Sequence, residues 1–191
     1  PENGYHGDYV HALAKSNDNP ISFHINQHKT VLNAINTTFD TWFPESNLHK
    51  SDDVPKALDY LNTHKFTFEL EKALWFNTTK FGDDKDRVLV KNDGNYTYFA
   101  VDIAYHKNKL DRNFTHLINI LGADHHGYVQ RMKAAVSALN KDASIDLKIG
   151  QLVNLFRNGT PVRMSKRTGD IITLQEVTDE IGSDAVRYFL S

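Results

Sequence analysis

One stretch of the chain, residues 116–139, limits the choice of fold more than any other: "HLINILGADHHGYVQRMKAAVSAL". An apolar run long enough for a buried strand leads to Gly122, and apolar residues at helical spacing follow this glycine. A buried strand that turns directly into a helix is typical of a parallel sheet covered by helices. We therefore predict an α/β fold built on a parallel sheet, in which ligands bind beyond the carboxyl ends of the strands.

The remaining helices are predicted from the spacing of apolar residues and from capping signals. Helical spacing recurs over residues 5–14, 23–38 and 54–64. A capping box formed by Thr173-Glu176 predicts the start of another helix near the end of the chain. Residues 39–51 mix aromatic residues with helix breakers, which favours a short strand followed by a loop.

Two tight turns predict hairpins. Asp93-Gly94 lies near segments rich in aromatic and β-branched residues, 72–79 and 86–100. Asn158-Gly159 lies within residues 147–164, which we interpret as a second hairpin.

Composition narrows the class of protein. The chain has 191 residues, of which 40% are hydrophobic and 24% charged, as in an ordinary soluble globular protein. A formal net charge of -2 argues against nucleic-acid binding through bulk positive charge, although a local basic patch is compatible with it. The chain has no cysteine, which excludes disulfides and thiolate chemistry and is compatible with a reducing compartment. No apolar run approaches the roughly 20 residues of a membrane span. Because the chain opens with Pro1 and stops within a helical pattern, we expect it to be a piece of a longer protein.

The first candidate site is "GADHHGY", where the predicted strand becomes a helix. Asp124 could simply cap the helix, with His125 and His126 on the surface. The same three residues could form a manganese site of the kind found in phosphoesterases with an Asp-His-His motif, although the further aspartate motifs of those enzymes are missing. Alternatively, Asp124 could accept hydrogen bonds from ribose hydroxyls or from a substrate cation at a position that ligands favour.

The second candidate site lies in "NYTYFAVDIAYH", residues 95–106. If a helix begins near Tyr98, then Tyr98 and Asp102 lie four residues apart and share one face. A carboxylate can accept a two-pronged contact from a guanidinium, and a neighbouring phenol can fix its orientation. A half-buried tyrosine beside a helix aspartate is the simpler alternative.

The third candidate site is the basic turn "RMSKRT". Arg163, Lys166 and Arg167 could bind phosphates, with Ser165 and Thr168 as hydroxyl donors. The glycine spacing of a P-loop is absent, and a solvated basic turn is the simpler alternative.

Four long blocks, taken in order, resemble bacterial-type arginyl-tRNA synthetases, a family of class I aminoacyl-tRNA synthetases. The resemblance covers nearly the whole chain, and the blocks are "PENGYHGDY", "FGDDKDRVLVKNDGNYTYFAVDIAYH", "GADHHGYVQRMKAA" and "PVRMSKRTGDIITLQEVTDEIGSDAVRYF". The resemblance implies a Rossmann-like catalytic core that activates arginine with ATP and Mg²⁺ and charges tRNA(Arg). It also implies a cytoplasmic, usually monomeric enzyme that needs no membrane and no tightly bound, protein-ligated metal.

The resemblance also assigns roles to the basic turn. "RMSKRTG" is similar to the second class I signature, the lysine-methionine-serine-lysine-serine loop. Lys166 matches the second lysine and would stabilise the ATP phosphates as pyrophosphate leaves, with Met164 and Ser165 beside it. Arg163 stands in place of the first lysine as a second catalytic cation.

For the other two candidate sites, the resemblance implies a substrate pocket. Tyr98 and Asp102 match the tyrosine-aspartate pair that holds the arginine side chain. Gly122 and Asp124 would contact ATP, and His125 would lie between the amino-acid and adenosine pockets, on the arginine side.

The first class I signature, histidine-x-glycine-histidine, does not occur in the chain. We therefore expect residues 1–170 to be part of a catalytic domain and residues 171–191 to begin the helical junction to an anticodon-binding domain. On its own the chain is expected to be nearly inactive. A metal-dependent phosphoesterase and a non-catalytic nucleotide- or tRNA-binding module stay open as alternatives.

Overall fold

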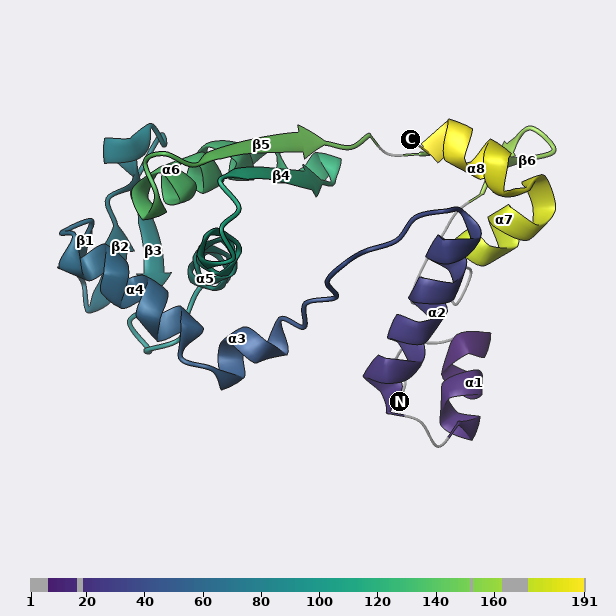
Figure 1. Cartoon of the computed structure of the whole chain (residues 1–191), viewed down its shortest axis with the longest axis horizontal. Helices are drawn as coiled ribbons and strands as arrows, with labels where there is room; N and C mark the ends of the chain where they lie inside the picture. Colours follow the sequence, from purple (N-terminus) through teal and green to yellow (C-terminus); the bar gives the residue numbers. More distant parts are fainter. Residues whose placement is uncertain (1–6, 17–18, 152, 163–171, 191) are drawn as a thin grey trace. The chain divides into compact units, whose positions relative to one another are not determined.

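A computed structural model describes residues 7–16, 19–151, 153–162 and 172–190. The chain divides into two compact units. Residues 43–152 form one, here called the sheet unit, and residues 1–42 together with 153–191 form the other, here called the helical unit. Each is described separately (Figure 1).

A parallel pair of strands in the sheet unit confirms the predicted order of strand, turn and helix. The first strand is not buried as predicted, because the side chains of Ile118 and Ile120 are exposed. β4 (His116–Leu121) runs parallel to β5 (Ser144–Ile149) in continuous register. α6 (Val129–Leu139) connects the two strands, and a 3₁₀ segment, η2 (Ala123–Tyr128), lies between β4 and α6. The segment 147–149, which was predicted to belong to a hairpin, therefore lies in this parallel pair instead.

An antiparallel sheet forms the other β layer of the sheet unit. Its strand order is β1 (Thr67–Leu70), β2 (Ala73–Phe76) and β3 (Arg87–Val90). The predicted pairing after the Asp93-Gly94 turn is reduced to one bridge between Val90 and Tyr96. It stops there because the chain starts a helix at the second residue after Tyr96.

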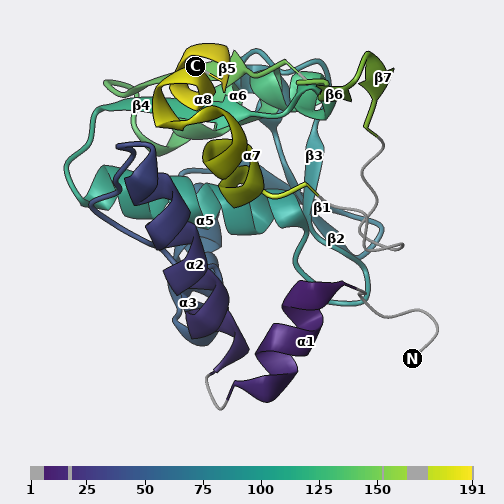
Figure 2. The ribbon, with the colours of Figure 1, turned by 90° about the vertical axis from the view of Figure 1, so that its right-hand side faces the viewer.

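Helices pack against both sheets and enclose the core of the sheet unit. α4 (Asp53–Thr63) and α5 (Tyr98–Asp111) pack on each other, and α6 packs on β5. Figure 1 views α5 along its axis, and Figure 2 shows it from the side, below β4 and β5. The largest fully buried side chains of this core include Phe76, Leu48, Leu61, Leu89, Ile103 and Met132.

The strand predicted within residues 39–51 does not form. The chain is irregular up to Pro44, and α3 (Ser46–Lys50) follows. Pro44 lacks the N–H that a strand ladder would need, while its carbonyl accepts a hydrogen bond from Asn47 N at 2.9 Å. The side chain of Leu48 is then buried in the core.

The helical unit contains α1 (Asp8–Lys15), α2 (Pro20–Ala34), α7 (Leu174–Ile181) and α8 (Ser183–Leu190). α7 starts with the predicted capping box of Thr173 and Glu176. The Asn158-Gly159 turn closes a hairpin of β6 (Phe156–Arg157) and β7 (Thr160–Pro161), as predicted, with positive φ at both turn residues. Arg187 of α8 donates to the Ile35 carbonyl after α2, at 2.6 Å.

In the described ranges, no helix combines the length and the apolar character that crossing a membrane would require.

Candidate functional site

The start of α5 places the predicted tyrosine and aspartate. The Thr97 side chain accepts a hydrogen bond from Ala100 N at 3.3 Å and so caps the helix. The Thr97 hydroxyl also lies 2.9 Å from the Val88 carbonyl oxygen, to which it donates, which ties the cap to β3. The helix therefore begins at Tyr98, and Tyr98 and Asp102 share one face, as predicted. Tyr98 is 87% exposed and is accessible to a ligand.

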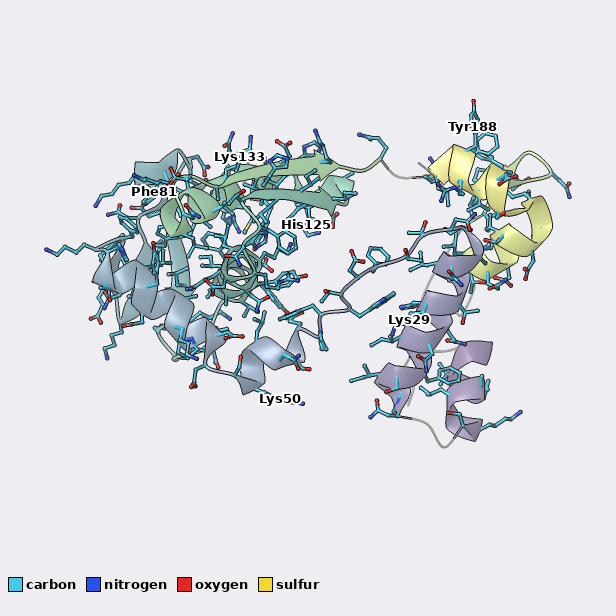
Figure 3. The ribbon with its side chains drawn as sticks, in the orientation of Figure 1. Lys29, Lys50, Phe81, His125, Lys133 and Tyr188 are labelled. Carbon is cyan, nitrogen blue, oxygen red and sulfur yellow. The ribbon has the colours of Figure 1, made fainter. Side chains whose placement is uncertain are left out.

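The segment after β4 presents the second predicted group. Gly122 is the residue before η2, and its carbonyl accepts a hydrogen bond from His125 N at 3.0 Å. A Cβ atom at Gly122 would lie 2.8 Å from Asp124 Oδ1, so a larger residue would displace this carboxylate. His125 Nε2 lies 3.7 Å from the same Oδ1. Figure 3 draws the His125 side chain beside the carboxyl end of β4.

Asp124 does not cap this segment, so this part of the simplest interpretation of the motif is wrong, whereas His125 and His126 are exposed as that interpretation expected. No side-chain cap bond is formed at the start of η2, and the Asp124 side chain is 85% exposed. Its carboxylate is therefore available to a ligand.

Tyr128 joins the two candidate sites. Its hydroxyl donates a hydrogen bond to Asp102 Oδ2, across 26 residues of sequence. Burial raises the pKa of the Tyr128 phenol above its usual range, and the bond to Asp102 raises it further. Tyr128 is therefore a protonated donor at neutral pH. We did not single it out from the sequence, although it ends the "GADHHGY" motif.

A buried histidine lies on the other side of Asp102. His106 Nδ1 is 2.7 Å from the Asp102 carbonyl oxygen, and His106 Nε2 is 2.7 Å from Asn119 Nδ2 on β4. Burial lowers the pKa of this imidazole, which favours the neutral form. A carbonyl can only accept, so Nδ1 carries the proton and Nε2 accepts from the amide. Lys109 Nζ donates to Asn119 Oδ1 at 3.3 Å and completes the chain of contacts between α5 and β4.

Cationic and aromatic side chains surround the Tyr128 ring. The Arg131 guanidinium carbon lies 5.1 Å from the centroid of this ring and 5.7 Å from that of Phe99. The rings of Phe99 and His125 each meet Tyr128 edge-on, with centroids 6.2 Å away. These contacts hold Tyr128 between the core and the exposed histidine.

The other predicted groups are not placed. Arg163, Met164, Ser165 and Lys166 fall outside the described residues. Within the described ranges, no group of three or more His, Cys, Asp or Glu side chains is arranged to hold a metal ion. Asp124, His125 and His126 lie within these ranges, so the phosphoesterase alternative gains no support from the geometry.

The fold agrees with that of known proteins. The family model of the catalytic domain of class I tRNA synthetases (R) matches residues 8–189. The chain therefore belongs to this family of class I tRNA synthetases, which confirms the predicted family and fold class.

Individual relatives carry one name, arginine--tRNA ligase. The protein of that name from Elusimicrobium minutum is 50% identical over 206 residues, and the one from Geobacillus thermodenitrificans is 44% identical over 213 residues. Both alignments cover 100% of this chain but 38% of the relative. The chain thus spans well under half the length of these curated relatives.

Solved structures agree in fold. A protein from Campylobacter jejuni, assigned as an arginyl-tRNA synthetase, superposes with a TM-score of 0.84 at 37% identity, over 98% of this chain and 45% of the other. The arginyl-tRNA synthetase of Thermus thermophilus superposes with a TM-score of 0.70 over 84% of this chain and 34% of the other. Its identity is 18%, so this second likeness concerns the fold alone.

Proposed function

We propose that this chain is part of an arginine--tRNA ligase, which activates arginine with ATP and transfers it to tRNA(Arg). The observation that carries the proposal is the shared helix face of Tyr98 and Asp102 at the start of α5, where Asp102 is bonded to η2, the segment that follows the parallel strand β4. The names of the relatives support the same activity.

Asp102 is proposed to select the arginine side chain. A carboxylate accepts two parallel N–H bonds from a planar guanidinium, a geometry that an ammonium cannot reproduce. The exposed Tyr98 is proposed to lie against the same guanidinium and limit its orientation. His125 would contact the amino-acid end of the substrate.

ATP is proposed to bind beyond the end of β4. The absence of a side chain at Gly122 leaves room for the Asp124 carboxylate, which is exposed and can accept hydrogen bonds from ribose hydroxyls. The arginine carboxylate then attacks the α-phosphorus of ATP, the bond to the bridging oxygen breaks, and pyrophosphate leaves. The terminal ribose of the tRNA next attacks the arginyl-adenylate and releases AMP. Mg²⁺ is proposed to enter with ATP, because this ion is commonly held through substrate phosphates.

The basic turn is proposed to act on the phosphates. Lys166 and Arg163, with Met164 and Ser165 between them, take this role from the resemblance to the second class I signature. A cation directed at charge that develops on the leaving group lowers the barrier more than it strengthens binding.

The remaining proposals concern the whole protein. Residues 1–170 would be part of the catalytic domain, and residues 171–191, which contain α7 and α8, would lead into a further helical domain. The enzyme would be a cytoplasmic monomer, a setting compatible with a chain that has no cysteine.

Asp102→Asn in the full-length gene product tests the arginine pocket. The neutral amide keeps the size of the side chain but loses one acceptor and the charge, so the KM for arginine should rise at least about 30-fold. Arginine-dependent ATP–pyrophosphate exchange measures this KM. Asp111→Asn is the matched control, since Asp111 lies at the other end of α5 and pairs with Lys107 on the surface. An unchanged arginine KM for Asp102→Asn would remove the pocket assignment.

A further inference from the structure

We infer that Tyr128 is a positioning residue for arginine recognition: its hydroxyl holds the Asp102 carboxylate in the orientation that the guanidinium requires. The inference rests on the proposed function, because it takes Asp102 as the group that binds arginine. It adds a residue that touches Asp102 and comes from a different element, η2.

The hydrogen bond leaves Asp102 able to bind a ligand. An ionised carboxylate has two oxygens and about four lone-pair sites, and the Tyr128 hydroxyl uses one site on Oδ2. Oδ1 and the remaining site on Oδ2 stay available for a two-pronged contact. In the described part of the chain, Tyr128 is the side chain that donates to this carboxylate. Without that donor, the aspartate would be free to exchange between rotamers on the helix surface.

Tyr128 is itself held in place by packing. Its ring meets Phe99 edge-on, and Phe99 stacks on Phe76, a fully buried residue of the core. The Arg131 guanidinium lies over the Tyr128 ring from α6. The position of the hydroxyl is therefore determined by the core of the sheet unit and not by the exposed surface.

The same ring also touches the segment that holds the proposed ATP groups. His125 meets the Tyr128 ring edge-on with centroids 6.2 Å apart, and both residues belong to η2. Tyr128 thus sets the spacing between Asp102 on α5 and the Asp124-His125 pair. A residue with this role should affect arginine binding through its hydroxyl and leave the chemical step largely unchanged.

Tyr128→Phe in the full-length gene product removes the hydroxyl and keeps the ring. We expect the KM for arginine to rise about tenfold, while the KM for ATP and kcat change less than about threefold. Tyr60→Phe is the matched control, because the Tyr60 hydroxyl also makes a part-buried bond in the sheet unit, to the Leu139 carbonyl at 3.0 Å. The control should leave the arginine KM unchanged.

A double-mutant cycle separates positioning from general stability. In the Asp102→Asn background, Tyr128→Phe should add less than about twofold to the arginine KM, because the carboxylate that it orients is gone. A full tenfold effect in that background would overturn the inference. Loss of hydrogen-exchange protection throughout α5 in Tyr128→Phe would also overturn it, since the hydroxyl would then have a structural role.

The cycle also distinguishes the inference from the proposed function. If Asp102→Asn raises the arginine KM and Tyr128→Phe does not, the inference is wrong and the pocket assignment stands. If Asp102→Asn itself leaves the arginine KM unchanged, the proposed pocket fails, and the inference fails with it.

Discussion

His106 illustrates how one buried side chain links the candidate site to the fold. It is 4% exposed, and its two ring nitrogens connect the Asp102 carbonyl on α5 to Asn119 on β4. A charged imidazole would donate from both nitrogens and would need an acceptor opposite each, yet Nε2 faces the Asn119 amide nitrogen, which is itself a donor. The neutral form is therefore part of the packing between α5 and β4.

The titration of His106 predicts a loss of local stability in mild acid. Burial lowers its pKa in the folded state, so below about pH 6.5 the unfolded chain takes up a proton that the folded chain does not. The stabilisation is complete above about pH 6.5 and falls as the pH drops toward the lowered pKa. One proton changes the free energy by at most about 1.4 kcal/mol per pH unit.

Hydrogen exchange of the α5 amides at pH 7.5 and pH 5.5, corrected for intrinsic rates, measures this effect. His106→Gln should remove the pH dependence of α5 protection. His64→Gln is the matched control, because His64 Nδ1 makes a similar contact to the carbonyl four residues earlier, at 2.8 Å, but at an exposed site. Equal pH dependence in wild type and His106→Gln would contradict the assignment of this pH dependence to His106.

At the scale of elements, the connection between β2 and β3 depends on a buried ion pair. Arg87 Nε lies 2.8 Å from Asp83 Oδ2, and the side chains of Arg87 and Asp83 are 13% and 1% exposed. Arg87 also pairs with Asp84, whose side chain is 74% exposed. Although burial raises the pKa of Asp83, the hydrogen bonds from Arg87 and from the Asp84 backbone lower it to about 2. The pair therefore stabilises the fold above about pH 4, and this contribution disappears as the pH falls toward 2.

Asp83→Asn should lower the free energy of unfolding of the sheet unit by about 3 kcal/mol, because Arg87 would lose its buried countercharge. Asp84→Asn removes a charge of the same sign from the neighbouring residue and should cost less than about 1 kcal/mol, since that charge is exposed. Urea denaturation compares the stability of the two variants. Tryptophan fluorescence follows the unfolding, because Trp75 lies on β2 of the sheet unit. Equal effects of both substitutions would show that burial does not distinguish the two aspartates.

At the scale of the whole molecule, the proposed reaction predicts that Lys166 affects the rate of adenylate formation and not the binding of arginine. Lys166→Ala in the full-length gene product should slow adenylate formation at least about 100-fold, because the cation acts on charge that develops in the transition state. The arginine KM should change little. Single-turnover measurement of adenylate formation tests this, with Lys133→Ala on the exposed side of α6 as the control. An unchanged rate would remove the role assigned to Lys166.

Local signals in the sequence predicted several elements correctly. The start of α5 and the shared face of Tyr98 and Asp102 follow from helical spacing, and the capping box of α7 follows from two residues three apart. The strand and helix around Gly122 follow from hydrophobic periodicity. These features depend on interactions within a few residues, so the order of residues is enough to identify them.

The tertiary structure alone decided which of these groups meet. Tyr128 and Asp102 are 26 residues apart, and their hydrogen bond exists because the chain crosses from α5 through β4 into η2. The neutral state of His106 and the pairing of β5 with β4 depend in the same way on packing between distant segments. The sequence by itself determined the family, the helix that carries Asp102 and the turn that carries Asp124. The distance between Asp102 and Asp124 depends on burial and strand register across many residues, and no local sequence pattern contains that information.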